Sequence, residues 1–311
     1  NAVLGIVSLI VLFKIGKKLV SEHFGFLWSL LYLASFLPHL YFKSGIIDPY
    51  FNFFIFLSIY FLILTISKPT NKNMNGLVSG IFIGLAIITK GPVGLLLLIL
   101  TFVVYIFWKK GRVKIKPLSV FLFFISSLSV TFIWFGYETI TNSPWFILEF
   151  IQYQIELLTE PVAGHEQPFY YHFLVVLLGC FPISILAIPA FLKSEKLIGY
   201  DFTLWMKILF WVVLILFSIV QSKIVHYSSL SYFPLTFLAA LVMDKLIKKE
   251  IQLNTWMRNG LIAVGSLFVI ATITTPIIAK NIDLLIPYID NTFAQENLKA
   301  DVYWSGWEVI C

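Results

Sequence analysis

Long apolar stretches, separated by short polar connections, constrain this chain more than any other feature of its sequence. A transmembrane helix needs about 20 predominantly apolar residues, because roughly 30 Å of hydrocarbon is crossed at about 1.5 Å per residue. The chain has 311 residues, of which 59% are hydrophobic and 12% are charged, and its mean hydropathy is +0.91. Soluble domains are about 25% charged, and disordered chains carry far less apolar surface. The sequence therefore predicts an all-α polytopic membrane protein.

Charged and Pro/Gly-rich connections divide the chain into ten candidate spans. Residues 75–108 would form a helix about 51 Å long, and we expect Lys90-Gly91-Pro92 to divide it, since Gly permits a tight reversal and Pro tolerates a helix start. Gly76, Gly80 and Gly84 form a small-residue stripe that favours close helix packing. The ten candidates lie near residues 1–13, 25–42, 50–67, 75–89, 91–108, 118–136, 171–191, 205–221, 229–243 and 259–279.

Positive charge is concentrated in alternate connections between these spans. One set of connections holds 17 of the 22 basic residues, and the positive-inside rule places that set in the cytoplasm. The net charge of +6 is thus mainly a signal of topology, and it does not favour binding of nucleic acid. The other set, which we expect to face outward, holds Lys43, Lys90, Lys223, Lys280 and Lys299.

The two ends of the chain differ from its middle. The first candidate span has only thirteen residues before Lys14, so we expect a further span and an outward loop upstream. Residues 280–311 are more polar, and their last part, 301–311, alternates like a β-strand. We therefore predict a membrane core over residues 1–279 and the start of an extracytoplasmic domain over residues 280–311.

Three outward connections carry ionisable groups next to hydrocarbon. Asp48 is the only acidic residue between Glu22 and Glu138. It is either a solvated loop residue or a functional one, and ionisable groups at the membrane favour function. Lys90 either snorkels to the interface or binds a phosphate as a point charge. The segment 221–227 repeats this situation, with Lys223, His226 and Tyr227 within five positions.

The outward connection 137–170 is the longest. Its residues 146–158 interleave aromatic and aliphatic side chains with polar ones, which predicts an amphipathic helix in the membrane interface. The histidines His165 and His172 could bind a divalent metal, but their spacing around a proline matches no familiar ligand pattern. The two tyrosines Tyr170 and Tyr171 are typical of an interfacial aromatic belt.

Signatures of soluble enzymes are absent from the sequence. It contains no P-loop, no dinucleotide-binding glycine pattern and no nucleophile elbow. We therefore expect the energy for any reaction to come from an activated substrate that resides in the membrane. The alternative is a secondary transporter or flippase of a lipid-linked or anionic substrate, in which intramembrane charges mark a permeation path.

Five short motifs, in a fixed order on the outward side, resemble a known family. They resemble the bacterial GT-C glycosyltransferases of the lipid A aminoarabinose transferase and protein O-mannosyltransferase group, over roughly residues 1–280. The fold implied is a GT-C-like helical bundle with interfacial loop helices facing outward. The motifs are the Asp48 loop, Thr89-Lys90-Gly91-Pro92, Pro144-Trp145-Phe146, residues 164–171 and Ser222-Lys223-Ile224-Val225-His226-Tyr227.

The resemblance implies an enzyme of the bacterial inner membrane, with its site facing the periplasm or exterior. Such enzymes transfer a sugar from a polyprenyl-phosphate carrier to a lipid, glycan or protein acceptor. The family's main catalytic carboxylates lie in the first outward loop, which we expect upstream of this sequence. Asp48 matches an acidic residue near the reaction centre. The implied substrate-binding residues are Lys90, His165, Gln167, Tyr170, Tyr171, Lys223, His226 and Tyr227.

We expect the polar candidates to meet in space. Cations beside a departing phosphate stabilise its growing charge, and carboxylates stabilise an oxocarbenium-like sugar and activate an acceptor hydroxyl. The hypothesis therefore requires that Asp48, Lys90, His165 and Lys223 share one hollow that opens away from the cytoplasm.

Overall fold

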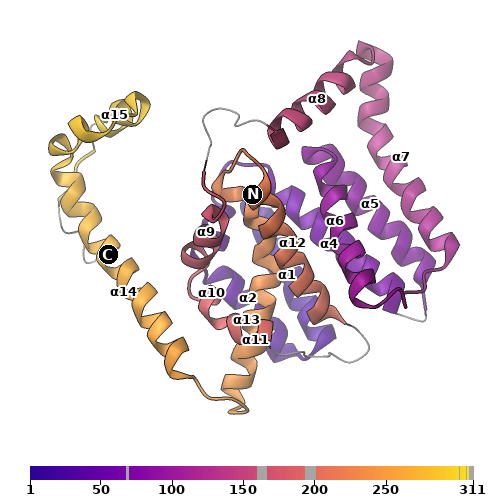
Figure 1. Ribbon diagram of the computed structural model, residues 1–311, viewed down its shortest axis with the longest axis horizontal. Coiled ribbons are helices and arrows are strands. Elements are labelled where there is room, and N and C mark those ends of the chain that lie inside the picture. Colours follow the sequence, from indigo (N-terminus) through magenta and orange to yellow (C-terminus); the bar gives the residue numbers. More distant parts are fainter. Residues whose placement is uncertain (68–69, 160–166, 193–200, 301, 306, 308–311) are drawn as a thin grey trace. The chain divides into compact units, whose positions relative to one another are not determined.

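The structure is a computed structural model, which describes residues 1–67, 70–159, 167–192, 201–300, 302–305 and 307 (Figure 1). Over these residues the chain is helical and contains no β-strand, as predicted. It divides into two compact units, Asn1–Gln252 and Leu253–Cys311.

The first unit is mainly α-helical over the residues that the structure describes. Its α-helices are α1 (Ala2–Leu19), α2 (Glu22–Leu33), α3 (Phe36–Tyr41), α4 (Asp48–Ser67), α5 (Lys72–Lys90), α6 (Val93–Trp108), α7 (Pro117–Asn142), α8 (Trp145–Thr159), α9 (Tyr171–Gly179), α10 (Ile183–Leu186), α11 (Ile188–Leu192), α12 (Phe202–Ile219) and α13 (Tyr232–Ile247).

All ten predicted spans lie in helical segments, but only some of those segments are single membrane-length helices. Within the described residues, six helical stretches are long and apolar enough to cross a membrane, and a seventh crossing would be a bent pair of helices. The apolar helix α6 is shorter. The six stretches are Asp48–Ser67, Lys72–Lys90, Pro117–Asn142, Phe202–Ile219, Val225–Ile247 and Thr255–Lys280.

Two predicted spans are broken, which corrects the sequence-based picture. Span 25–42 is interrupted between α2 and α3, and span 171–191 bends by 104° between α9 and the helices that follow it. Pro38 and Pro182 each lie within or just before the helix that follows the break. Proline lacks a backbone N–H, and its ring clashes with the carbonyl four residues earlier, which is that of Ala34 for Pro38 and of Leu178 for Pro182. These residues lie at the ends of α2 and α9, so both helices end there although the hydropathy continues.

The core of the first unit is aromatic. The indole of Trp28 in α2 packs edge-on against Phe56 of α4 and Phe237 of α13, with ring centroids 6.1 and 5.0 Å apart. Its N–H donates a hydrogen bond of 3.0 Å to Thr236 Oγ1, so its one polar atom is satisfied. The Phe56 ring also stacks on Phe233 with a centroid separation of 4.5 Å. These contacts fix α4 against α13 and thereby position the segments at the outer ends of both.

Helices α4 to α7 are held together by small residues. A side chain at Gly80 would meet the backbone oxygen of Phe123 in α7 at 2.2 Å, so only glycine permits this approach. The predicted packing role of the glycine stripe is therefore confirmed. Ser58 of α4 and Ser79 of α5 each donate a 2.8 Å hydrogen bond to the other's carbonyl oxygen.

The turn between α5 and α6 is the predicted one. Helix α5 ends at Lys90 and α6 begins at Val93. Gly91 has φ +98°, a backbone conformation that side chains rarely tolerate. A side chain there would also come within 2.8 Å of the Phe150 ring, so the turn lies directly against α8.

The second unit contains α14 (Thr255–Lys280), the short 3₁₀ helices η3 (Ile282–Leu284) and η4 (Ile286–Tyr288), and α15 (Thr292–Leu298). The β-strand predicted for residues 301–311 is not formed at residues 302–305 or 307, and the rest of that segment lies outside the described residues. The proposed boundary between residues 279 and 280 coincides with the last turn of α14 and stays a prediction.

Candidate functional site

A cavity of about 310 Å³ lies where the ends of several helices meet. Its walls come from the start of α4, the turn between α5 and α6, the middle of α8, the end of α12, and the 3₁₀ helix η2 (Val225–Ser231). Its polar lining consists of Asp48, Asn52, Lys90, Tyr153, Gln154 and Tyr227. Segments that are far apart in the sequence thus supply one polar hollow in an apolar protein.

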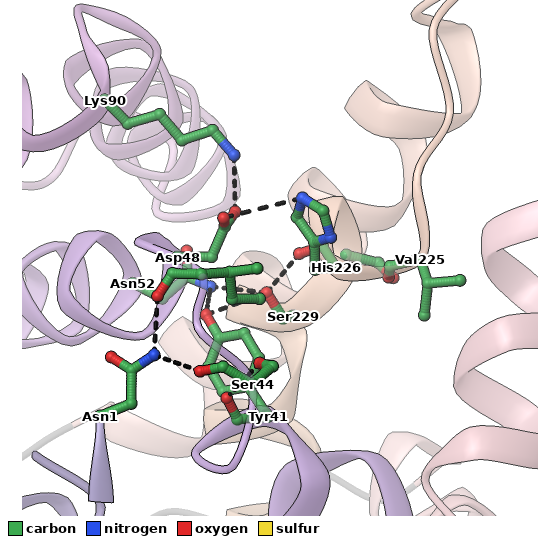
Figure 2. Close-up of polar contacts among 11 residues, drawn as sticks. Asn1, Tyr41, Ser44, Asp48, Asn52, Lys90, Val225, His226 and Ser229 are labelled. Atoms are coloured by element: carbon green, nitrogen blue, oxygen red, sulfur yellow. Dashed lines mark hydrogen bonds and ion pairs between the residues drawn. The ribbon is translucent and has the colours of Figure 1, made fainter. Parts of the chain in front are cut away.

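Asp48 is the centre of the charges in this cavity. It is the first residue of α4, where a carboxylate is favoured by the helix dipole, and only 4% of its surface is exposed. Lys90 Nζ donates to Asp48 Oδ1 over 2.6 Å, and His226 Nε2 lies 3.7 Å from Asp48 Oδ2. Figure 2 shows the ammonium and the imidazole approaching the carboxylate from two different directions. Three outward segments therefore meet at one carboxylate.

Lys90 makes a second contact that fixes its direction. Its ammonium lies 4.7 Å from the ring centroid of Tyr227, within cation–π range. Its side chain is 28% exposed and lines the cavity, and its ammonium contacts both the carboxylate and the ring. The Lys90 ammonium is thus held in one orientation by two contacts, which favours this reading over snorkelling to the membrane interface.

A buried network of hydrogen bonds lies beside the ion pair. Asn52, one turn after Asp48 on α4, donates through Nδ2 to Tyr41 Oη at 2.6 Å and to Ser229 Oγ at 2.8 Å. Ser229 Oγ also lies 3.1 Å from Tyr41 Oη and donates to the carbonyl oxygen of His226. Figure 2 shows the three side chains directly beside Asp48. The network ties η2, which carries His226 and Tyr227, to α4.

The loop before Asp48 is held by Asn1. The Asn1 side chain donates from Nδ2 to the carbonyl oxygens of Ser44 and Ile46, the latter at 2.8 Å (Figure 2). The start of α1 therefore fixes the loop that leads into α4.

An apolar groove of about 810 Å³ runs between α6 and α12. Its walls are mainly aliphatic and aromatic, with Lys109, Asp201 and Lys207 at one end and Leu216 and Ile219 at the other. Lys109 and Asp201 form an ion pair. Leu216 lines both this groove and the Asp48 cavity, so the two spaces adjoin. Such a groove suits a long apolar chain attached to a polar head.

Lys223 occupies a different environment from Lys90. Only 6% of its surface is exposed, and it does not line the Asp48 cavity. It lies close enough to the fully buried His172 to act on it electrostatically. Neither ring nitrogen of His172 has a hydrogen-bond partner. Asp48 and Lys90 therefore share one hollow, as expected, whereas Lys223 lies outside its lining.

The remaining predicted residues lie at or beyond the edge of the described site. Gln167 and Tyr170 are exposed and Tyr171 is half-buried, and none of them lines the Asp48 cavity. His165 lies outside the described residues. The substrate-binding roles of these four residues stay predictions.

Three residues of the cavity were missed by the sequence reasoning. Asn52 has a signal that could have found it, because it is a polar residue four positions after Asp48 in an apolar span and so shares its helix face. Tyr153 and Gln154 lie in the predicted amphipathic helix, which forms as α8. Their role in the wall could not be read from periodicity, which does not say what α8 covers.

Metal binding finds no support in the part of the chain that the structure describes. No group of three or more His, Cys, Asp or Glu side chains there is arranged to hold an ion. His172, one half of the histidine pair considered above, is fully buried.

Comparison with known proteins gives consistent results. Residues 1–135 match the family model described as dolichyl-phosphate-mannose-protein mannosyltransferase. The undecaprenyl phosphate-alpha-4-amino-4-deoxy-L-arabinose arabinosyl transferase of Wigglesworthia glossinidia brevipalpis is 27% identical over 228 residues, which cover 70% of this chain and 39% of that protein. The protein of the same name from Photorhabdus laumondii is 24% identical over 284 residues, or 88% of this chain and 50% of that protein.

The fold matches a solved structure as well. The crystal structure of ArnT from Cupriavidus metallidurans bound to undecaprenyl phosphate superposes with a TM-score of 0.75 at 17% identity, and the match covers 99% of this chain and 54% of that one. The molecule is thus an all-α membrane protein with the GT-C-like helical fold of ArnT. The resemblance predicted from the motifs is confirmed, since the chain is similar in sequence to the aminoarabinose transferases. It spans half or less of the length of the curated relatives described above.

Proposed function

We propose that this protein is a glycosyltransferase that moves a sugar from a polyprenyl-phosphate carrier to an acceptor at the outer face of the bacterial inner membrane. The observation that carries the proposal is the convergence of Lys90 and His226 on Asp48 in a polar cavity adjoining an apolar groove. A lipid-linked sugar phosphate needs both kinds of space. The similarity to aminoarabinose transferases supports the same reading.

The proposed reaction breaks the bond between the anomeric carbon of the sugar and the phosphate oxygen. The electron pair leaves with the carrier phosphate, and a lone pair of the acceptor oxygen forms the new bond to the same carbon. Lys90 stabilises the phosphate with hydrogens that Asp48 does not use, because charge-assisted bonds are strongest where a negative charge grows. In this scheme, the acceptor proton passes to the first-loop carboxylates that the family resemblance implies.

Asp48 acts in this scheme as a positioning carboxylate. Its carboxylate pairs with Lys90 at 2.6 Å and lies 3.7 Å from His226 Nε2. It aims the ammonium at the phosphate and offers its free lone pairs to a sugar hydroxyl. Lys223 and His172 lie outside the lining of this cavity, and we assign Lys223 to a more distant part of an anionic substrate.

The substrates follow from the relatives and from the groove. The named relatives act on an undecaprenyl-phosphate-linked amino sugar, and we propose the same donor class here, with its tail along the groove between α6 and α12. A lipid of the outer leaflet is the favoured acceptor, with a glycan or a protein as the other acceptors that the resemblance implies. Secondary transport is not favoured, because the charged candidates cluster at helix ends and the relatives are named as transferases.

The test measures transfer from undecaprenyl phosphate-linked 4-amino-4-deoxy-L-arabinose to lipid A by the full-length protein in liposomes. Lys90→Ala should lower the rate about 100-fold or more, as loss of one preorganised donor does at other charged transition states, and Asp48→Asn should also lower it strongly. Lys43→Ala, which removes an exposed lysine from the same outward side, is the control and should stay near the wild-type rate. Wild-type rates in both site variants would remove these assignments, and uptake without a covalent product would favour transport.

A further inference from the structure

Asn52 is held in an unusual way for a side chain that faces a cavity. Both hydrogens of its amide nitrogen are used, one for Tyr41 Oη at 2.6 Å and one for Ser229 Oγ at 2.8 Å. Tyr41 is fixed by edge-on packing against Phe42 and Tyr232. Ser229 is fixed in turn by its bond to the carbonyl oxygen of His226. Two rigid partners on two different elements therefore fix the plane of the amide.

The other end of this amide is unused. Asn52 Oδ1 accepts no hydrogen bond from any residue that the structure describes, while Asn52 is among the residues that line the cavity. Only 3% of the surface of Asn52 is exposed, and that residue lines the cavity. An amide oxygen without a donor from the protein has both lone pairs free for a donor on a bound molecule.

The neighbours of Asn52 define which part of a substrate would supply the donor. Asp48 lies four residues before it on the same face of α4, about 6 Å along the helix axis. The ammonium of Lys90 is bound at that carboxylate, so the phosphate of a donor would lie on the Lys90 side. The next group along the cavity is the sugar ring, whose hydroxyl and amino groups are hydrogen-bond donors.

We infer that Asn52 is a specificity-determining residue whose fixed amide Oδ1 accepts a hydrogen bond from a hydroxyl or amino group of the transferred sugar. This inference rests on the proposed function and adds to it the recognition of the sugar itself. Tyr41 and Ser229 are positioning residues, because they hold the amide so that its oxygen, and not its nitrogen, meets the sugar. A site built to bond a polar hydrogen discriminates strongly against a ligand that lacks it.

The experiment compares two lipids on the full-length protein in nanodiscs. The probes are undecaprenyl phosphate and undecaprenyl phosphate-linked 4-amino-4-deoxy-L-arabinose, and native mass spectrometry measures the affinity for each. Wild-type protein should prefer the sugar-bearing lipid. Asn52→Ala and Asn52→Leu should weaken binding of that lipid roughly five- to tenfold and leave the affinity for undecaprenyl phosphate unchanged. Asn52→Leu keeps the volume, and Tyr41 and Ser229 can then pair with each other, so it guards against simple misfolding.

Tyr41→Phe separates recognition from structure. It removes one acceptor of the amide but leaves Ser229 and the Asn52 oxygen in place, so it should lower the thermal midpoint while most of the preference for the sugar remains. Equal weakening of both lipids by Asn52→Ala, or retention of the sugar preference in both Asn52 variants, would overturn the inference and leave the proposed function standing. If wild-type protein binds neither lipid, the proposed function itself fails.

Discussion

A half-buried lysine, Lys90, and a buried one, Lys223, show how differently one residue type can be used. Lys90 ends α5, pairs with Asp48 at 2.6 Å and lies over the Tyr227 ring. Lys223 lies between α12 and η2 and has neither a hydrogen bond nor an ion pair with any described residue. A buried charge without a counterion is costly, whereas one in a well-formed pair is oriented at modest cost. The proposed function therefore gives the two lysines different roles, with Lys90 oriented in advance at the reacting phosphate and Lys223 placed to receive a more distant anionic group.

The largest expected effect tests whether Lys90 and Asp48 act as one unit. Lys90→Met and Asp48→Asn should each lower sugar transfer about 100-fold, and the double variant should be little worse than either single one. Contacting residues in one charged network are strongly non-additive. Rates of all four proteins with the undecaprenyl-phosphate-linked donor measure this coupling.

A matched double-mutant cycle tests Lys223, in place of Lys90, together with Asp48. Lys223→Met combined with Asp48→Asn should give additive losses, because Lys223 forms no ion pair with Asp48. Equal coupling in both cycles would show that the two lysines share one site in the working enzyme and would contradict the difference between their surroundings.

A smaller effect is expected on stability, with opposite signs for the two lysines. Lys90→Met removes the main partner of a carboxylate whose side chain is 6% exposed, so the thermal midpoint should fall by about 2–4 °C. Lys223→Met replaces a buried ammonium that has no ion pair within the described part of the chain by an apolar side chain of similar length, so the midpoint should stay the same or rise by a similar amount. Thermal unfolding in detergent without lipid measures both, and exposed Lys43→Met is the control.

A fall in the midpoint of Lys223→Met as large as that of Lys90→Met would show that Lys223 is already neutralised in the protein. If Lys223 instead receives an anion from the substrate, adding undecaprenyl phosphate should raise the midpoint of the wild type more than that of Lys223→Met, since a ligand that binds only the folded state stabilises it.

The smallest expected effect concerns the ring under Lys90. Tyr227→Phe keeps a π-face and should retain transfer within about twofold, whereas Tyr227→Leu should lose roughly two- to fivefold, in keeping with a half-exposed cation–π contact. The same transfer assay measures both variants. A larger loss in Tyr227→Phe than in Tyr227→Leu would assign the phenolic oxygen, and not the ring, as the functional group.

The sequence predicted much of the fold because membrane spans are a local property. Each of the ten spans located by hydropathy over about 20 residues lies in a helical segment, and Lys90-Gly91-Pro92 and the glycine stripe predicted the turn and the packing face. It failed at spans 25–42 and 171–191, where Pro38 and Pro182 interrupt helices that hydropathy treats as continuous. The backbone bonds that proline removes are invisible to an average of side-chain hydrophobicity.

The candidate site was predicted in part. Asp48, Lys90, His226 and Tyr227 were selected because charges and polar groups at the hydrocarbon boundary are expensive, and the structure brings these four together. Tyr153 and Gln154 were missed as members of the cavity, because a phenol or an amide in an amphipathic helix has an ordinary structural explanation, whereas Asn52 was overlooked although it follows Asp48 by one turn in an apolar span. Lys223 was grouped with Lys90 from sequence pattern alone, and its surroundings differ.

By itself, then, the sequence determined that the chain is a helical membrane protein with its unusual ionisable groups on one side, because the cost of placing charge in lipid acts on each segment separately. Only the tertiary structure decided which groups touch. The partners Lys90 and Asp48 are 42 positions apart, and Asn52 and Ser229 are 177 positions apart. Such pairs are set by how the aromatic core docks α4 against α5 and η2, and this packing depends on the shapes of many side chains at once.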